Sequence, residues 1–158
     1  MATAVVLDCD WFVIGGRKYL KQLAYFVPST LVSDTYSFTL PSRSHHCRCD
    51  LRKQAYHSHG LLWSQRGDFR DDQVPLAFCT IFTALLLRPV ELKFHAKGLE
   101  KCHLLEQWLP EVFNLDEIGC PRFELLSELR KTTDNKAKVF GTWLKNQSEL
   151  PTLSPPPL

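Results

Sequence analysis

The stretch "VVLDCDWFVIGG", Val5 to Gly16, is an apolar run that carries two aspartates and ends in two glycines. The apolar residues predict a buried strand, and residues i and i+2 of a strand project from the same face. Asp8 and Asp10 are therefore expected to point the same way. Two neighbouring carboxylates raise the free energy of ionising each other, and a divalent cation such as Mg²⁺ or Mn²⁺ relieves that repulsion. A frayed strand end, with Asp10 in a solvated turn, is the alternative.

Composition indicates a globular protein with one domain. The chain has 158 residues, of which 44% are hydrophobic and 23% charged, and its formal net charge is +2. These values are those of a folded chain that buries a core. So small a charge argues neither for nor against nucleic acid as a partner. We expect a domain over residues 1–145 and a disordered proline-rich tail over residues 146–158.

The longest apolar run, "VPLAFCTIFTALLL" (74–87), is too short to span a bilayer, so we expect no membrane segment. The first residues do not form a secretory signal, because acidic residues follow too soon. We therefore expect an intracellular protein, nuclear or cytoplasmic. In that setting the six cysteines are expected to be reduced rather than bridged.

Hydrophobic periodicity predicts the order β-β-β-α-β-α-β-α-α. Three strands come first, over residues 4–14, 18–27 and 34–41, with Gly15 and Gly16 as the first turn. Further strands are expected within 89–98 and 111–119. The four helices of this order are expected over residues 73–87, 99–109, 120–133 and 136–146, and residues 51–60 are a candidate for an additional short helix. A three-strand antiparallel meander followed by alternating helices and strands is an α/β arrangement with a mixed sheet.

Read in this order, the chain resembles the ribonuclease H-like fold, and more closely the DEDD 3′–5′ exonuclease superfamily. That family opens with a strand ending in Asp-x-Glu, which "VLDCD" resembles, with Asp10 at the position of the glutamate. In "FHAKGLEKCHLL" (94–105), Glu100 falls at or near the aspartate of the second motif. Lys97 and Lys101 depart from that motif.

The third motif of the family, on a C-terminal helix, is His-x4-Asp or Tyr-x3-Asp. In the corresponding region of this sequence Asp134 is the candidate for that aspartate. The histidine or tyrosine that serves as general base in the family is absent from the region. "KGLEK" (97–101) and "IGCP" (118–121) also resemble nuclease-like proteins of mobile-element or viral type. The resemblance implies catalytic and metal-binding roles for Asp8, Asp10, Glu100 and Asp134, with Mg²⁺ or Mn²⁺ as cofactor.

Each of these residues also has a purely structural interpretation. Glu100 fits a solvated residue in the first turn of a helix, and Asp134 fits an N-cap. His59 fits a turn before Gly60, and His95 fits a buried imidazole as well as one that faces substrate. These alternatives stay open at the level of sequence.

A competing metal signal lies in "HHCRCDLRKQAYHSHG" (45–60). It gathers six zinc-type donors, namely His45, His46, Cys47, Cys49, His57 and His59. Their spacing does not match the usual zinc frameworks. The same segment is rich in arginine and lysine around Tyr56 and Trp63, a composition that suits either a phosphate backbone or a solvated basic loop.

Three functions follow as hypotheses. The first is a divalent-metal-dependent 3′–5′ exonuclease that acts on nucleic-acid 3′ ends, DNA or RNA. The second is a catalytically inactive protein of the same fold that binds nucleic acid or a protein partner. The third is a small zinc-stabilised interaction module.

Overall fold

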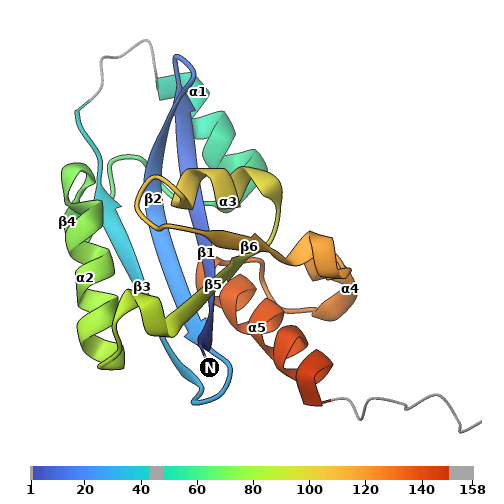
Figure 1. Cartoon of the computed structure of the whole chain (residues 1–158). Helices are drawn as coiled ribbons and strands as arrows, with labels where there is room; N and C mark the ends of the chain where they lie inside the picture. The colour runs from blue at the N-terminus through green and yellow to red at the C-terminus, as the bar shows by residue number, and fades with distance from the viewer. Residues whose placement is uncertain (1, 43–47, 150–158) are drawn as a thin grey trace, which may run out of the picture.

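The computed structural model describes residues 2–42 and 48–149, which form a twisted six-stranded sheet flanked by helices (Figure 1). The spatial order of the strands is β4-β3-β2-β1-β5-β6. Their bounds are β1 (Thr3–Ile14), β2 (Arg17–Val27), β3 (Val32–Thr39), β4 (Phe69–Arg70), β5 (Leu92–Ala96) and β6 (Val112–Asn114).

The first three strands form the predicted antiparallel meander. Gly15 and Gly16 connect β1 to β2 with φ of 57° and 78°, values that a glycine adopts without strain. β2 pairs antiparallel with β3, whereas β5 pairs parallel with β1, and β6 parallel with β5. The expected α/β class with a mixed sheet is thus confirmed.

The helices cover both faces of this sheet. They are α1 (Arg48–Gln54), continued by a π-helical turn at Ala55–His59, then α2 (Val74–Leu85), α3 (Leu99–Leu105), α4 (Phe123–Leu126) and α5 (Thr133–Glu149). Side chains of β1 alternate between two hydrophobic clusters. Val5, Leu7 and Cys9 pack in the cluster that contains α2, whereas Val6 packs in the cluster that contains Phe140 of α5. Asp8 and Asp10 follow Val6 on the α5 side.

Two features of the C-terminal part differ from the sequence prediction. The helix expected over residues 120–133 ends at Leu126, because Ser127 adopts extended backbone angles. The last helix begins at Thr133 rather than at residue 136 and continues to Glu149, so residues 146–149 are helical and not part of a tail. The two-residue strand β4 was not expected, because so short a run has no detectable period.

The approach of α5 to the sheet depends on Gly141. A Cβ atom at this position would lie 2.2 Å from Cδ1 of Phe26 in β2, which is far inside van der Waals contact. The missing side chain therefore lets the helix backbone lie close to the sheet. This close packing brings the first turn of α5 over the end of β1.

A β-bulge shapes the same part of the sheet. Asp10 pairs with Gln22 and Trp11 pairs with Leu20, so Lys21 is the extra residue on β2. Its side chain is buried, and Nζ donates hydrogen bonds to the carbonyls of Phe38 (2.9 Å), Trp63 (3.4 Å) and Gln65. The bulge thus redirects a lysine to hold the segment before β4 against the sheet.

Within residues 2–42 and 48–149, no helix combines the length and the apolar character needed to cross a membrane.

Candidate functional site

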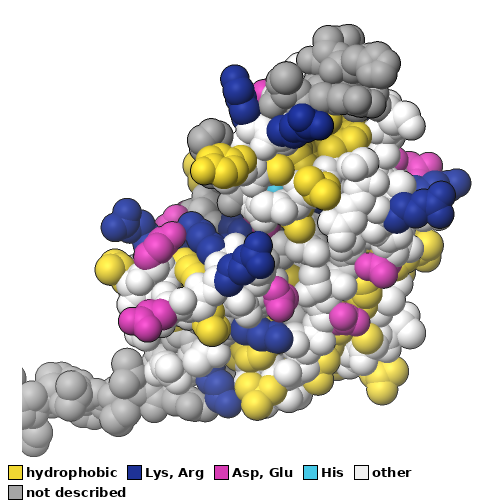
Figure 2. Space-filling model, turned by 180° about the vertical axis from the view of Figure 1, so that it is seen from behind, with side chains coloured by type: hydrophobic (Ala, Val, Ile, Leu, Met, Phe, Trp, Pro, Cys, Tyr) yellow, Lys and Arg dark blue, Asp and Glu magenta, His cyan; other side chains and the backbone are white. Residues whose placement is uncertain are grey.

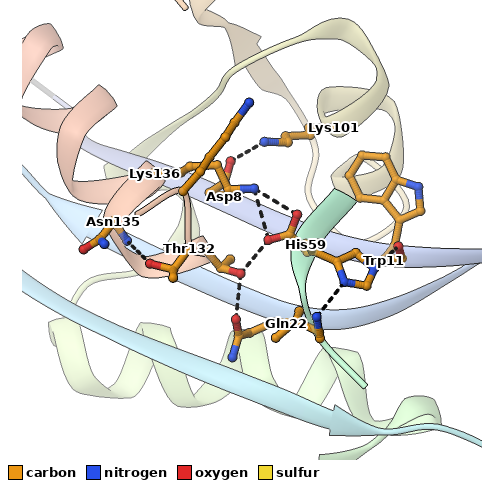
Figure 3. Close-up of polar contacts among 12 residues, drawn as sticks. Asp8, Trp11, Gln22, His59, Lys101, Thr132, Asn135 and Lys136 are labelled. Carbon is orange, nitrogen blue, oxygen red and sulfur yellow. Dashed lines mark hydrogen bonds and ion pairs between the residues drawn. The ribbon is translucent and has the colours of Figure 1, made fainter. Parts of the chain in front are cut away.

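Asp8 and Asp10 lie together on one face of β1, as the strand alternation predicts, and both are buried. Asp8 has no exposed surface, and Asp10 is 7% exposed. The first turn of α5 and the start of α3 lie above them (Figure 3). Two carboxylates in such a place need compensating charge, since a buried unpaired carboxylate is very unfavourable.

Two lysines supply that charge. Nζ of Lys136, in α5, lies 2.9 and 3.1 Å from the two carboxylate oxygens of Asp10 and 3.1 Å from Oδ2 of Asp8. The contact with Asp8 Oδ2 lacks hydrogen-bond geometry and is an ion pair only. Nζ of Lys101, in α3, hydrogen-bonds Asp8 Oδ1 at 2.5 Å. We call these four residues, Asp8, Asp10, Lys101 and Lys136, the Asp–Lys cluster.

Thr133 completes the coordination of Asp10. Its hydroxyl lies 2.6 Å from Asp10 Oδ2 and 2.7 Å from Oε1 of Gln22. A hydroxyl carries one proton, and we assign it to the carboxylate because a charged acceptor makes the stronger hydrogen bond. Both carboxylate oxygens of Asp10 are therefore occupied by protein donors.

The surroundings shift the pKa values of the two aspartates of the Asp–Lys cluster in opposite directions. Burial raises the pKa of Asp8, because the loss of hydration outweighs the attraction of Lys101 and Lys136. Burial acts on Asp10 in the same direction, yet the pair with Lys136 and the hydrogen bonds from Thr133 and Lys136 hold its pKa below the ordinary value. Burial would lower the pKa of Lys101, but its pair with Asp8 raises it. The attraction between unlike groups thus keeps both lysines next to the carboxylates.

The cluster opens into a cavity of about 680 Å³. The lining residues come from β1, α1, α3, the segment before α5 and α5 itself, and they are Asp10, Trp11, Val13, Lys53, Gln54, Glu100, Lys101, Lys131 and Lys136. Gln54 fixes α1 to β1 through two hydrogen bonds of 2.7 Å with the backbone of Val13. We call this space the lysine cavity, because four of its lining side chains are lysines.

Glu100 lines the lysine cavity but does not join the aspartates. Its carboxylate forms an ion pair of 3.1 Å with Lys18, and its side chain is 64% exposed. Lys18 also lies over the ring of Trp11, 5.2 Å from the centroid. Glu100 therefore occupies the rim of the cavity, as a solvated residue in the first turn of α3.

Asp134 does not join the aspartates either. It accepts a hydrogen bond of 2.6 Å from the hydroxyl of Thr132, which holds the pKa of Asp134 below its ordinary value. The structural alternative, an N-cap, is not confirmed either, because Asp134 is the second residue of α5 and lies within its first turn. The neighbours of Asp134 in the same helix, Thr133 and Lys136, are the ones that reach β1.

The predicted divalent cation does not fit this arrangement. In the part of the chain that the structure describes, no three His, Cys, Asp or Glu side chains are grouped to hold a metal ion. The carboxylate oxygens that would bind Mg²⁺ or Mn²⁺ instead contact the ammonium groups of Lys101 and Lys136 or the hydroxyl of Thr133. A cation and an ammonium group repel each other, so a metal would have to displace the lysines first.

Sequence reasoning missed Lys101, Thr133 and Lys136 as members of the site. Helical spacing could have identified Thr133 and Lys136 as core-facing. Residues 133, 136 and 140 lie on one face of α5, and Phe140 is buried. In α3, Lys101 lies one turn before Leu105, which is also buried. A lysine at a core-facing position of a helix indicates a buried acidic partner.

The two histidines singled out in the sequence have different surroundings. Nδ1 of His59 accepts from the backbone N–H of Leu61 at 3.0 Å, so its Nε2 donates to the carbonyl of Trp11 at 3.1 Å. His59 is thus a structural link between the π-helical turn and β1. His95 is buried beside Phe113, and burial lowers its pKa to about 4. Three of the six donors in the zinc hypothesis, namely His45, His46 and Cys47, lie outside the described residues.

No family model matches the chain, and no curated protein matches it.

Proposed function

We propose that this chain is a catalytically inactive protein of the ribonuclease H-like type that binds nucleic acid at the lysine cavity. The observation that supports this most is the position of Lys136, whose ammonium group contacts both Asp8 and Asp10. The proposal favours the second hypothesis from the sequence over the metal-dependent exonuclease.

The chemistry of the cluster supports binding rather than hydrolysis. Two-metal phosphodiester hydrolysis needs one ion to activate water and a second to stabilise the leaving oxygen. In the Asp–Lys cluster the carboxylates are neutralised by ammonium groups, which donate hydrogen bonds but do not lower the pKa of a bound water as a metal does. The chain also lacks the histidine or tyrosine that the resemblance assigns as general base.

The charges around the cavity support nucleic acid as the ligand. Lys53 is exposed and has no ion-pair partner among residues 2–42 and 48–149. Lys131 pairs with Glu124 at 2.9 Å, but both side chains are more than half exposed, and such surface pairs contribute little. These two lysines are therefore free to contact phosphate groups. Seen from behind, Lys and Arg side chains gather near the middle of the molecule, with Asp and Glu among them (Figure 2).

The test measures binding and cleavage together. Fluorescein-labelled single-stranded DNA and RNA oligonucleotides are titrated with the protein in Mn²⁺ and in EDTA, by fluorescence polarisation. The same mixtures are then run on denaturing gels. We expect similar affinity in both conditions and no shortening of the oligonucleotide. Lys53→Gln combined with Lys131→Gln should weaken binding severalfold, whereas Lys93→Gln, an exposed lysine outside the cavity, should not.

Three results would overturn the proposal. Shortening that requires Mn²⁺ and disappears in Asp8→Asn would show that the chain is an exonuclease. The wild type binding no oligonucleotide would exclude nucleic acid as a ligand of this cavity. Equal affinity of the wild type and the Lys53→Gln, Lys131→Gln variant would exclude it as well. The hypothesis of a protein partner would then take its place.

A further inference from the structure

A second cavity, of about 640 Å³, lies beside α1, next to the turn between β1 and β2 (Figure 1). Arg52 of α1 lines it, whereas Lys53 and Gln54, on another face of the same helix, line the lysine cavity. The wall also includes residues from 39–42, where β3 ends, and from the segment 62–66. We call this space the arginine cavity, because two of its lining side chains are arginines.

The wall of the arginine cavity is mainly apolar. Four of its side chains are buried and belong to the larger hydrophobic cluster of the core, namely Leu40, Leu51, Ala55 and Trp63. Leu62, which is 58% exposed, adds apolar surface on the solvent side. Cavities of about 300–1,000 Å³ with a mainly apolar wall and a few polar groups are typical of small-molecule sites. The arginine cavity has the size and the lining of such a site.

Three polar groups of this wall already have partners within the protein. Nε1 of Trp63 donates a hydrogen bond of 2.8 Å to the carbonyl of Pro41, and the carbonyl of Trp63 accepts one of 3.4 Å from Lys21. The hydroxyl of Thr39 accepts one of 2.8 Å from the backbone N–H of Gly67. A bound nucleobase or sugar needs hydrogen-bond partners, since a buried donor or acceptor left unpaired is unfavourable. A hydrocarbon chain needs none, so it suits this wall better.

The arginine cavity carries positive charge. Its charged side chains are those of Arg52 and Arg66, both exposed, and no described residue of its wall is acidic. Neither arginine forms an ion pair with a carboxylate in the part of the chain that the structure describes. A guanidinium group binds carboxylate or phosphate oxygens through paired hydrogen bonds. The two arginines therefore favour an anionic group on the solvent side of the cavity.

We propose that the arginine cavity binds a single hydrocarbon chain with an anionic head group, such as a fatty carboxylate or an alkyl phosphate. The chain packs against the buried apolar wall, and the head group pairs with Arg52 and Arg66. This site is independent of the proposed nucleic-acid binding, because no described residue lines both cavities.

The first test measures the binding of octanoate, decanoate and laurate to the whole chain by isothermal titration calorimetry, below the concentrations at which these ligands form micelles. We expect one ligand per chain and an affinity that rises about fourfold with each added methylene, because each methylene buries further apolar surface. Decyl phosphate is compared with decanoate to distinguish the two head groups, and binding of either supports the proposal. Decyltrimethylammonium, with the same chain and a positive head group, should bind about tenfold more weakly or less.

Two variants test the position of the ligand. Arg52→Gln combined with Arg66→Gln should weaken binding of the anions about tenfold or more, because the charge-assisted hydrogen bonds are lost. Leu62→Asp should also weaken it, because it places a carboxylate in the wall. Since Leu62 is more than half exposed, we expect this variant to fold, which circular dichroism confirms.

Each variant has a matched control. Arg122→Gln removes an exposed arginine outside the cavity, and Leu129→Asp changes a leucine that is 61% exposed and also lies outside it. Lys53→Gln combined with Lys131→Gln removes two lysines of the lysine cavity. All three controls should bind decanoate as the wild type does.

Four outcomes would overturn the proposal. They are no binding of decanoate or decyl phosphate, an affinity that does not rise with chain length, equal binding of decyltrimethylammonium, and unchanged binding in the Arg52→Gln, Arg66→Gln or the Leu62→Asp variant. Loss of binding in the Lys53→Gln, Lys131→Gln variant would overturn it as well, because the anion would then occupy the lysine cavity.

Discussion

Lys136 connects the two aspartates of β1 to the last helix of the chain. Its side chain is nearly buried and makes contacts with both carboxylates. Removing one partner of a buried ion pair leaves an uncompensated charge, which is far more costly than the loss of a surface pair. The packing of the first turn of α5 against β1 therefore depends on this ammonium group.

We predict that Lys136→Met lowers the free energy of unfolding by about 3–5 kcal/mol at neutral pH. Adding Asp10→Asn should recover part of the loss, because it removes the carboxylate left unpaired. Lys131→Met, at an exposed position of the same cavity, should change stability by about 0.5 kcal/mol or less. Urea denaturation measures all three, and a loss in Lys136→Met as small as in Lys131→Met would contradict the prediction.

Lys21 is a second buried lysine, and it has backbone carbonyls rather than a carboxylate around Nζ. Burial lowers its pKa from 10.5 to about 8. The folded state therefore binds this proton less tightly than the unfolded state does. Because the pKa of Lys21 is lower in the folded than in the unfolded state, the free energy of unfolding should rise with pH between about 8 and 10.5.

This pH dependence is tested against a variant that lacks the amine. We predict that the stability of the wild type, measured relative to Lys21→Met, increases as the pH is raised from the folded pKa of about 8 towards 10.5. Urea denaturation at several pH values in this window gives the difference, and subtraction cancels the groups that both proteins share. A difference that stays constant or falls would show that the three carbonyls keep Lys21 charged.

At the scale of the element, α5 depends on the small size of Gly141. Glycine in the middle of a helix is intrinsically unfavourable by about 1 kcal/mol relative to alanine. Here the close contact with Phe26 reverses that preference, because any Cβ would overlap the ring. The same close contact positions Thr133 and Lys136 over β1.

We predict that Gly141→Ala lowers the free energy of unfolding by about 1–3 kcal/mol, since the overlap exceeds the gain in helix propensity. Thr142→Ala is the control, because Thr142 is exposed on the same helix and its change should be neutral or slightly stabilising. Thermal unfolding followed by circular dichroism measures both. In Phe26→Leu, where the ring is absent, the effect of Gly141→Ala should shrink; an unchanged effect would argue against the contact as its cause.

At the scale of the whole molecule, the net charge of +2 limits how strongly any polyanion is attracted. Nucleic-acid binding must then depend on a few local lysines rather than on a general positive field. The salt dependence of binding measures the number of lysine–phosphate contacts, because each contact releases counterions.

We predict a shallow salt dependence for single-stranded oligonucleotides. A slope of log affinity against log salt concentration near −1.4 corresponds to two phosphate contacts, by Lys53 and Lys131, at about −0.7 each. Lys53→Gln should make the slope less negative by about one contact, and Lys93→Gln should leave it unchanged. Fluorescence polarisation at several salt concentrations gives the slopes. A wild-type slope several times steeper than predicted would indicate that a broader basic surface contacts the oligonucleotide.

Much of the fold was predictable because it depends on local patterns. The apolar run in residues 5–14, the glycine pair and the aromatic strands that follow specify a meander, in which each strand pairs with the next one along the chain. The position of Asp8 and Asp10 on one face follows from the period of the strand alone. The strand β4 was not predictable, because it is two residues long and is defined by its pairing with β3, about thirty residues earlier in the chain.

The sequence by itself determined an α/β chain with a mixed sheet and two buried acids side by side on its first strand. Only the tertiary structure decided what neutralises those acids. Lys101 lies 93 residues from Asp8, and Lys136 lies 126 residues from Asp10. Strand periodicity is a short-range property that can be read along the chain, whereas an ion pair forms wherever packing brings opposite charges within reach of each other.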